Sequence, residues 1–146
     1  SGADPAIKRA AHLADAWVIS PSWTPGRVEE KLHFYQSALQ EYGRSGQVTE
    51  TILRRDIHLG ATLQAARQEA QTLFDKGYRG FGPQEMQESL MVGGPEECIR
   101  YLENMQRLGI THVLFRPAMR EQRYVLQTIR LLGTEVIPHF AHVFTV

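Results

Sequence analysis

The sequence predicts an α/β fold in which parallel strands alternate with helices. Short apolar runs alternate along the chain with longer segments whose apolar residues recur at helical spacing. Glycine and proline stand at several boundaries between these segments. Because strands that alternate with helices form βαβ units, this order implies a parallel sheet.

The first predicted helix covers residues 5–14. Asp4 is a plausible N-cap, and Pro5 occupies the first helical position, which tolerates proline because its missing N–H would have no partner there. A short buried strand follows over residues 17–19, and Pro21 ends it. This first helix has no strand before it, so we expect the chain to begin inside the alternation.

The second predicted helix, over residues 27–42, has one continuous apolar stripe. Gly43 follows it, where a glycine commonly ends a helix in the left-handed conformation. Residues 53–60 then form a strand in which charged residues are interleaved with apolar ones. The remaining expected elements are helices over residues 62–76 and 83–89, a helix from Gly94, a strand over residues 111–116 and a helix over residues 120–132, with residues 135–140 closing the ordered part.

Three strong parallel strands leave two sheet edges unpaired, and folded proteins usually cover such edges. We therefore expect that the strands belong to a larger sheet or that a partner covers the edges. The length of 146 residues fits a single domain, residues 1–146.

The composition argues against several kinds of partner. Sixteen basic and sixteen acidic residues cancel, so no overall field favours nucleic acid or an anionic membrane. The sequence shows neither a signal peptide nor a membrane-spanning run. The single cysteine, Cys98, excludes an internal disulfide, and a cytoplasmic location is the default expectation.

The strand over residues 53–60 carries the main candidate site residues. Side chains of a strand alternate between its two faces. Arg54, Asp56 and His58 therefore share one face, and Arg55, Ile57 and Leu59 share the other. The polar face is either a binding site or a solvated, mutually paired surface, and the residues alone leave both readings open.

Other residues have simpler readings. Cys98 lies on the apolar stripe of a helix, which predicts a packed thiol rather than a nucleophile. Trp17 and Trp23 offer ring surfaces, and we expect Trp17, and also His112, to be core residues. No metal site is predicted, because the spacing of the other histidines does not match a ligand set: His12, His33, His139 and His142.

Three motifs, "AIKRAAHLADAWVIS", "LRRDIHLGATLQAA" and "VGGPEECIRYLENMQRLGITHVLFRP", occur in this order. Together they resemble the C-terminal part of the flavin-dependent luciferase-like monooxygenases. The resemblance covers nearly the whole chain. It implies a partial (β/α)8 TIM-barrel-like fold made of about the last three βα units.

The resemblance also implies site residues. The phosphate of FMN would lie at the start of the first helix, whose amides and dipole suit an anion, at Gly2, Ala3, Asp4 and Ala6. The family usually has hydroxyl-bearing residues there, and Asp4 would repel a phosphate unless it turned away. Asp4 as a simple N-cap is the alternative.

In several members of the same family an arginine at the position that matches Arg54 faces the flavin or the substrate. Asp56 and His58 would then point into the barrel mouth, together with Arg116 at the end of its strand, as substrate-binding residues. An arginine on the surface at a strand end is an equally ordinary reading of Arg116. Catalytic residues stay unassigned.

Two functions follow. In the first, the chain is part of an FMN-dependent monooxygenase acting on a small-molecule substrate and retains part of the flavin site. Alone, it is expected to bind FMN weakly or not at all and to be inactive. In the second, it is a non-catalytic α/β domain that binds no flavin and self-associates, a homodimer being the commonest arrangement.

Overall fold

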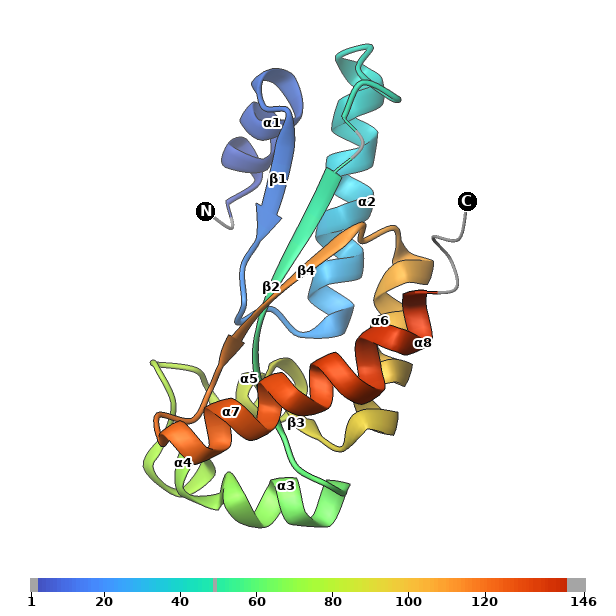
Figure 1. Cartoon of the computed structure of the whole chain (residues 1–146). Helices are drawn as coiled ribbons and strands as arrows, with labels where there is room; N and C mark the ends of the chain where they lie inside the picture. Colours follow the sequence, from blue (N-terminus) through green and yellow to red (C-terminus); the bar gives the residue numbers. More distant parts are fainter. Residues whose placement is uncertain (1–2, 49, 142–146) are drawn as a thin grey trace.

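The computed structural model describes residues 3–48 and 50–141 (Figure 1). Its strands are β1 (Ala16–Ile19), β2 (Glu50–Leu59), β3 (Met91–Gly93) and β4 (His112–Pro117). Its helices are α1 (Asp4–Leu13), α2 (Pro25–Glu41), α3 (Leu63–Glu69), α4 (Gln71–Lys76), α5 (Pro83–Ser89), α6 (Pro95–Leu108), α7 (Gln122–Leu131) and α8 (Ile137–Ala141), and a π-helical turn, η1 (Leu132–Val136), joins the last two. Among these helices none combines the length and the apolar character needed to cross a membrane.

All strand pairs in the sheet are parallel, as the sequence predicted. The long strand β2 is central: β4 pairs with its residues 52–57, β1 with its residues 50–53 and β3 with its residues 57–59. Since β4 overlaps both other partners, β1 and β3 must lie one after the other along the opposite edge of β2.

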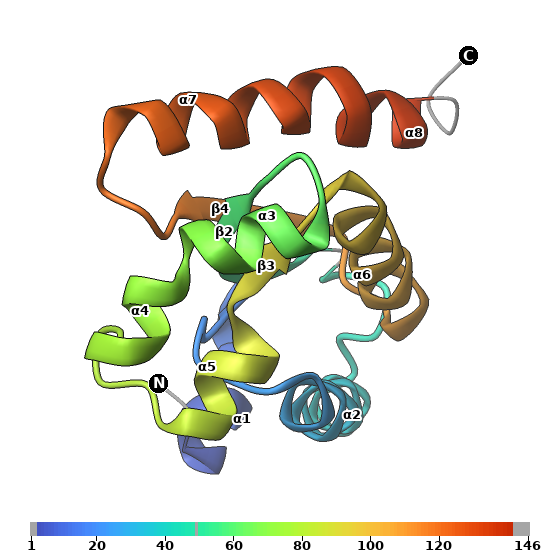
Figure 2. The same cartoon turned by 90° about the horizontal axis from the view of Figure 1, so that it is seen from below.

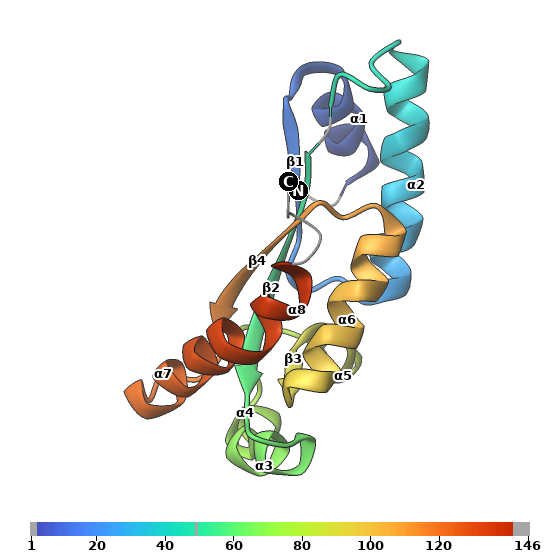
Figure 3. The ribbon, with the colours of Figure 1, turned by 45° about the vertical axis from the view of Figure 1, so that its right-hand side comes forward.

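One face of the sheet is covered by helices. Trp17, Ile19 and Leu53 pack in one core with α1 and α2, where Ile7 and Tyr35 are fully buried. Figure 3 shows α2 and α6 on the same side of the strands. This confirms Trp17 as a core residue.

A second core lies further along β2. Ile57 and Leu59 pack with Cys98 of α6 and Val136 of η1. Burial raises the pKa of the Cys98 thiol to about 12, so the prediction of a packed thiol is confirmed. Figure 2 shows that α7 and α8 follow one another along this side of the molecule.

The opposite sheet face is partly open. Val18 and Leu114 point to this face and are 56% and 55% exposed. Near the carboxyl end of the strands, however, a third core covers the face. It contains Tyr78 from the loop before α5, Met86 of α5, Leu90 directly after α5 and Ala118 directly after β4. The open part of the sheet is therefore its amino-terminal half.

Several predicted elements differ in the structure. The helix predicted over residues 62–76 is broken at Ala70, directly after Glu69, whose side chain is held by residues distant in sequence. Strand β3 lies where only loop was expected, because three residues are too few to show a periodicity. The last helical segment continues through η1 and α8 beyond residue 132.

Two side chains, His112 and Ile129, are exposed to solvent where a core position would be the simpler expectation. His112 is exposed, which corrects its assignment to the core. Ile129 of α7 is exposed although it is apolar, whereas the neighbouring Thr128 is buried. The reason is a tertiary hydrogen bond: the Thr128 hydroxyl accepts from the Leu59 amide at 3.1 Å, which turns this side of α7 toward the sheet.

Candidate functional site

The sequence-predicted polar residues of β2 lie on the face that is open at one end and covered at the other. Arg54 stands beside Leu114 of β4, and Asp56 stands beside Arg116 in the same register. His58 follows at the covered, carboxyl end of the strand. The structure thus brings Arg54, Asp56, His58 and Arg116 onto one face, as strand alternation predicted.

Asp56 and Arg116 form a bidentate ion pair. The Arg116 Nε donates to Oδ1 of Asp56 at 2.7 Å, and Nη2 donates to Oδ2 at 2.6 Å. The Asp56 side chain is fully buried, whereas 34% of the Arg116 side chain is exposed. The hydrogen bonds to Asp56 raise the pKa of Arg116, so its charge is fixed.

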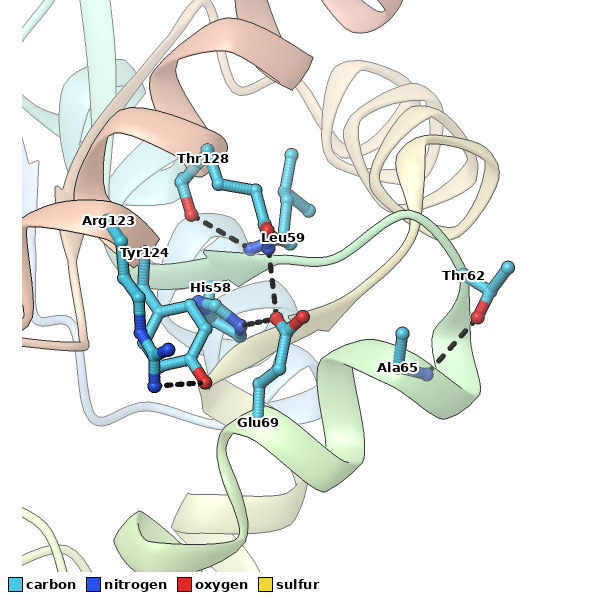
Figure 4. A network of polar contacts seen from close by, with 9 residues as sticks. His58, Leu59, Thr62, Ala65, Glu69, Arg123, Tyr124 and Thr128 are labelled. Carbon is cyan, nitrogen blue, oxygen red and sulfur yellow. Dashed lines mark hydrogen bonds and ion pairs between the residues drawn. The ribbon is translucent and has the colours of Figure 1, made fainter.

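His58 is fully buried and paired with Glu69 of α3 (Figure 4). The His58 Nε2 lies 2.6 Å from the Glu69 carboxylate, and because an ionised carboxylate only accepts, Nε2 carries the hydrogen. The ring of Tyr124 meets the imidazole edge-on, with centroids 5.3 Å apart. The Nδ1 atom of His58 is buried and has no hydrogen-bond partner among the described residues.

The pair is tied to helix α7. The Gln127 amide donates to the same Glu69 oxygen at 2.9 Å and to the Leu59 carbonyl at 2.8 Å. Glu69 was not anticipated from the sequence, because only the fold brings α3 and α7 to the end of β2. Asp56 and His58 are therefore neither solvated nor paired with each other, as one reading of the sequence proposed: both are buried, and their partners come from other elements.

Arg54 differs from its neighbours on this face. It is half-buried, and its Nε is shielded from solvent without a hydrogen-bond partner among residues 3–48 and 50–141. An orphan buried donor is uncommon, because desolvation without a replacement bond is unfavourable. Arg54 therefore offers an unused donor beside the open sheet surface.

Arg55, placed by strand alternation on the apolar face, has a structural role that the sequence analysis did not assign. It lies on the helix-covered face, fully buried, and its Nη1 donates to the Pro21 carbonyl at 2.7 Å. Its Nε donates to the hydroxyl of Tyr101, and burial raises the pKa of that hydroxyl, which keeps it protonated. The signal was available: a charge stands at an apolar position of the alternation. Arg55 fixes the loop that follows β1.

The start of α1 was the other candidate. Ala3 is the N-cap, without a side-chain cap bond, and Asp4 is the first helical residue, which corrects its assignment as N-cap. The Asp4 carboxylate bonds Lys31 of α2 at 3.0 Å. Pro5 has no N–H, and the Ala6 amide donates to the Ala3 carbonyl, so few amides stay free for an anion. Gly2 lies outside the described residues.

No family model matches the sequence, and no curated protein matches it. Solved structures do. The monooxygenase RslO1 from Streptomyces bottropensis has a TM-score of 0.67 at 21% identity, over 96% of this chain and 46% of its own. The coenzyme F420 dependent tetrahydromethanopterin reductase from Methanopyrus kandleri has a TM-score of 0.66 at 16% identity, over 96% and 49%.

Riboflavin lyase (RcaE), solved with modified FMN and the substrate riboflavin, has a TM-score of 0.71 at 11% identity, over 97% of this chain and 42% of its own. The chain spans about half the length of the solved structures it matches. At these identities the similarity shows the fold: the chain shares its parallel α/β arrangement with this monooxygenase, this coenzyme F420 dependent reductase and riboflavin lyase.

Proposed function

We propose that this chain is the C-terminal part of a flavin-dependent luciferase-like monooxygenase and supplies part of its flavin and substrate site. In this proposal β1, β2 and β4 are the last three strands of a (β/α)8 barrel, and the open sheet face is turned to the barrel interior. The parallel βα order and the neighbours that use FMN or F420 support it. The observation that carries it is the unpartnered Arg54 Nε beside the open face.

FMN fits this donor, since the isoalloxazine ring offers carbonyl oxygens and ring nitrogens that accept hydrogen bonds. Arg54 would orient the ring. Arg116, held in one orientation by Asp56, has N–H groups left for a substrate acceptor, and it is the exposed member of that pair. Since Asp56 and His58 are buried, we propose that they do not contact the substrate directly and instead hold the residues of the substrate site in position. The chemistry with molecular oxygen would come from the flavin, once it is bound and reduced.

The chain alone is expected to bind FMN weakly, because a barrel site draws residues from several strand ends and only part of them is present. Replacing Arg54 by alanine should weaken this binding by about tenfold, the loss of one charge-assisted hydrogen bond. The change in FMN fluorescence measures it. Arg107→Ala, at an exposed site on α6, is the control and should bind like the parent chain.

Equal FMN binding by the parent chain and by Arg54→Ala would refute the role of Arg54. No binding by either would favour the second function, a flavin-free α/β domain that self-associates. A specific observation supports that alternative: Val18 and Leu114 are exposed on the open face, and among the described residues the outer edges of β1 and β4 pair with no other strand.

If the open face is a self-association surface, the chain should be a dimer in sedimentation equilibrium, because pairing would remove apolar side chains and unpaired strand edges from water. Leu114→Lys should then shift the equilibrium to monomer, since a buried lysine would need a partner charge. Leu13→Lys, at an exposed leucine on α1, is the matched control. A parent chain that stays monomeric at high concentration would contradict this function.

A further inference from the structure

A cleft at the carboxyl end of the sheet is lined by residues other than Arg54, Asp56, His58 and Arg116 of the proposed flavin and substrate site. Its volume is about 330 Å³, at the lower end of the range for small-molecule sites, about 300 to 1,000 Å³. Helix α4 and the loop after it form one wall, and the connection from β4 to α7 forms the other. The lining residues that matter are Leu73, Lys76, Tyr78, Arg79, Ala118, Met119, Arg120 and Glu121.

The cleft combines an apolar floor with a cationic rim. Tyr78, Ala118 and Met119 are buried. Lys76, Arg79 and Arg120 are exposed, and none of them forms an ion pair with the residues that the structure describes. Glu121 is the one carboxylate in the lining. A protein of zero net charge thus gathers an excess of positive charge at one small cleft.

The loop that carries Arg79 has a backbone suited to hold it there. Arg79 has φ 48°, a left-handed conformation that is unfavourable for a residue with a Cβ atom. Gly77 and Gly80 on either side also have positive φ, at 81° and 74°, where glycine carries no such penalty. Strained residues of this kind cluster at ligand sites.

The Arg79 side chain is oriented by Tyr78. Its Nε donates to the Tyr78 hydroxyl at 3.1 Å, and its guanidinium lies 5.5 Å from the centroid of the Tyr78 ring. Burial, and then the Asp56 carboxylate, raise the pKa of Tyr78, so the hydroxyl stays neutral and accepts this bond. Among the described residues the two Nη groups of Arg79 have no partner, which leaves them available at the mouth of the cleft.

We propose that this cleft binds a small organic anion, with its carboxylate or phosphate group between Arg79 and Arg120 and its apolar body on Met119 and the Tyr78 ring. Guanidinium groups suit both anions, because their paired donors match two oxygens at once. The cleft would hold such a molecule whether or not the chain binds flavin, so the two proposals are independent.

The test is an amide NMR titration with benzoate and with phenyl phosphate, compared with the neutral benzyl alcohol. Both anions should shift the amides of residues 76–80 and 118–122, and benzyl alcohol should bind at least about tenfold more weakly because it lacks the charge. Added salt should weaken anion binding, since these cations are exposed. A preference for one anion identifies the group that the cleft favours.

The double variant Arg79→Asn/Arg120→Gln should lose anion binding, and asparagine is chosen because it tolerates the left-handed conformation. Both side chains are exposed, and Lys76→Gln on α4 gives a second variant that leaves the loop unchanged. Arg107→Gln is the control. Anion shifts spread over exposed cations elsewhere, equal binding of benzyl alcohol, or unchanged binding by the double variant would overturn the proposal.

Discussion

Replacement of Arg116 by methionine is expected to lower the free energy of unfolding by about 3 kcal/mol. The reason is that Asp56 would keep its buried carboxylate and lose both of its hydrogen bonds. Removing one partner of a buried ion pair typically costs about 3–5 kcal/mol. We take the lower end because 34% of the Arg116 side chain is exposed and the pair is partly screened by solvent. Urea unfolding measures the change.

A double-mutant cycle separates the pair from other effects. Asp56→Asn should cost less than Arg116→Met, because the arginine left behind reaches water. The combined variant should be more stable than the sum of the single effects predicts, by about 1–3 kcal/mol. Arg107→Met, at an exposed position of α6, should change stability by less than about 0.5 kcal/mol. If Arg116→Met were as mild as this control, the ion pair would contribute nothing measurable.

Replacement of Gly60 by alanine should destabilise the chain by about 3 kcal/mol, at the top of the range for overpacking. A Cβ at this position would lie 2.6 Å from the Ala66 nitrogen and 2.8 Å from its Cα. These are backbone atoms of α3, so the helix itself must move. Because α3 carries Glu69, the displacement should also disturb the His58–Glu69 pair.

Gly26→Ala is the matched control. A Cβ there meets nothing within 4 Å, and the residue lies in the first turn of α2. Alanine has the higher helix propensity, so this variant should be as stable as the parent or slightly more stable, by up to about 1 kcal/mol. Thermal unfolding of the two variants side by side gives the difference. Equal stabilities would mean that α3 yields to the new methyl group without cost.

Much of the site could be predicted from local pattern, and the missing part has one cause. Strand alternation placed Arg54, Asp56 and His58 on one face, because the two-residue period of a strand is a local property. The partners were out of reach of this reasoning: Glu69 comes from α3, and Arg116 faces Asp56 through the register of β4 on β2. Register depends on how whole strands pair.

The sequence by itself determined the order of the longer helices and strands and the parallel sheet, since apolar periodicity and the positions of glycine and proline act within a few residues. Gly43, with φ 66° at the end of α2, is one such local determinant. Only the tertiary structure decided that Arg55 bonds the Pro21 carbonyl, that Ile129 is exposed and that the helix expected over residues 62–76 breaks at Ala70. In each case a contact between distant residues outweighs the local pattern, because burial and hydrogen bonding depend on what the fold brings alongside.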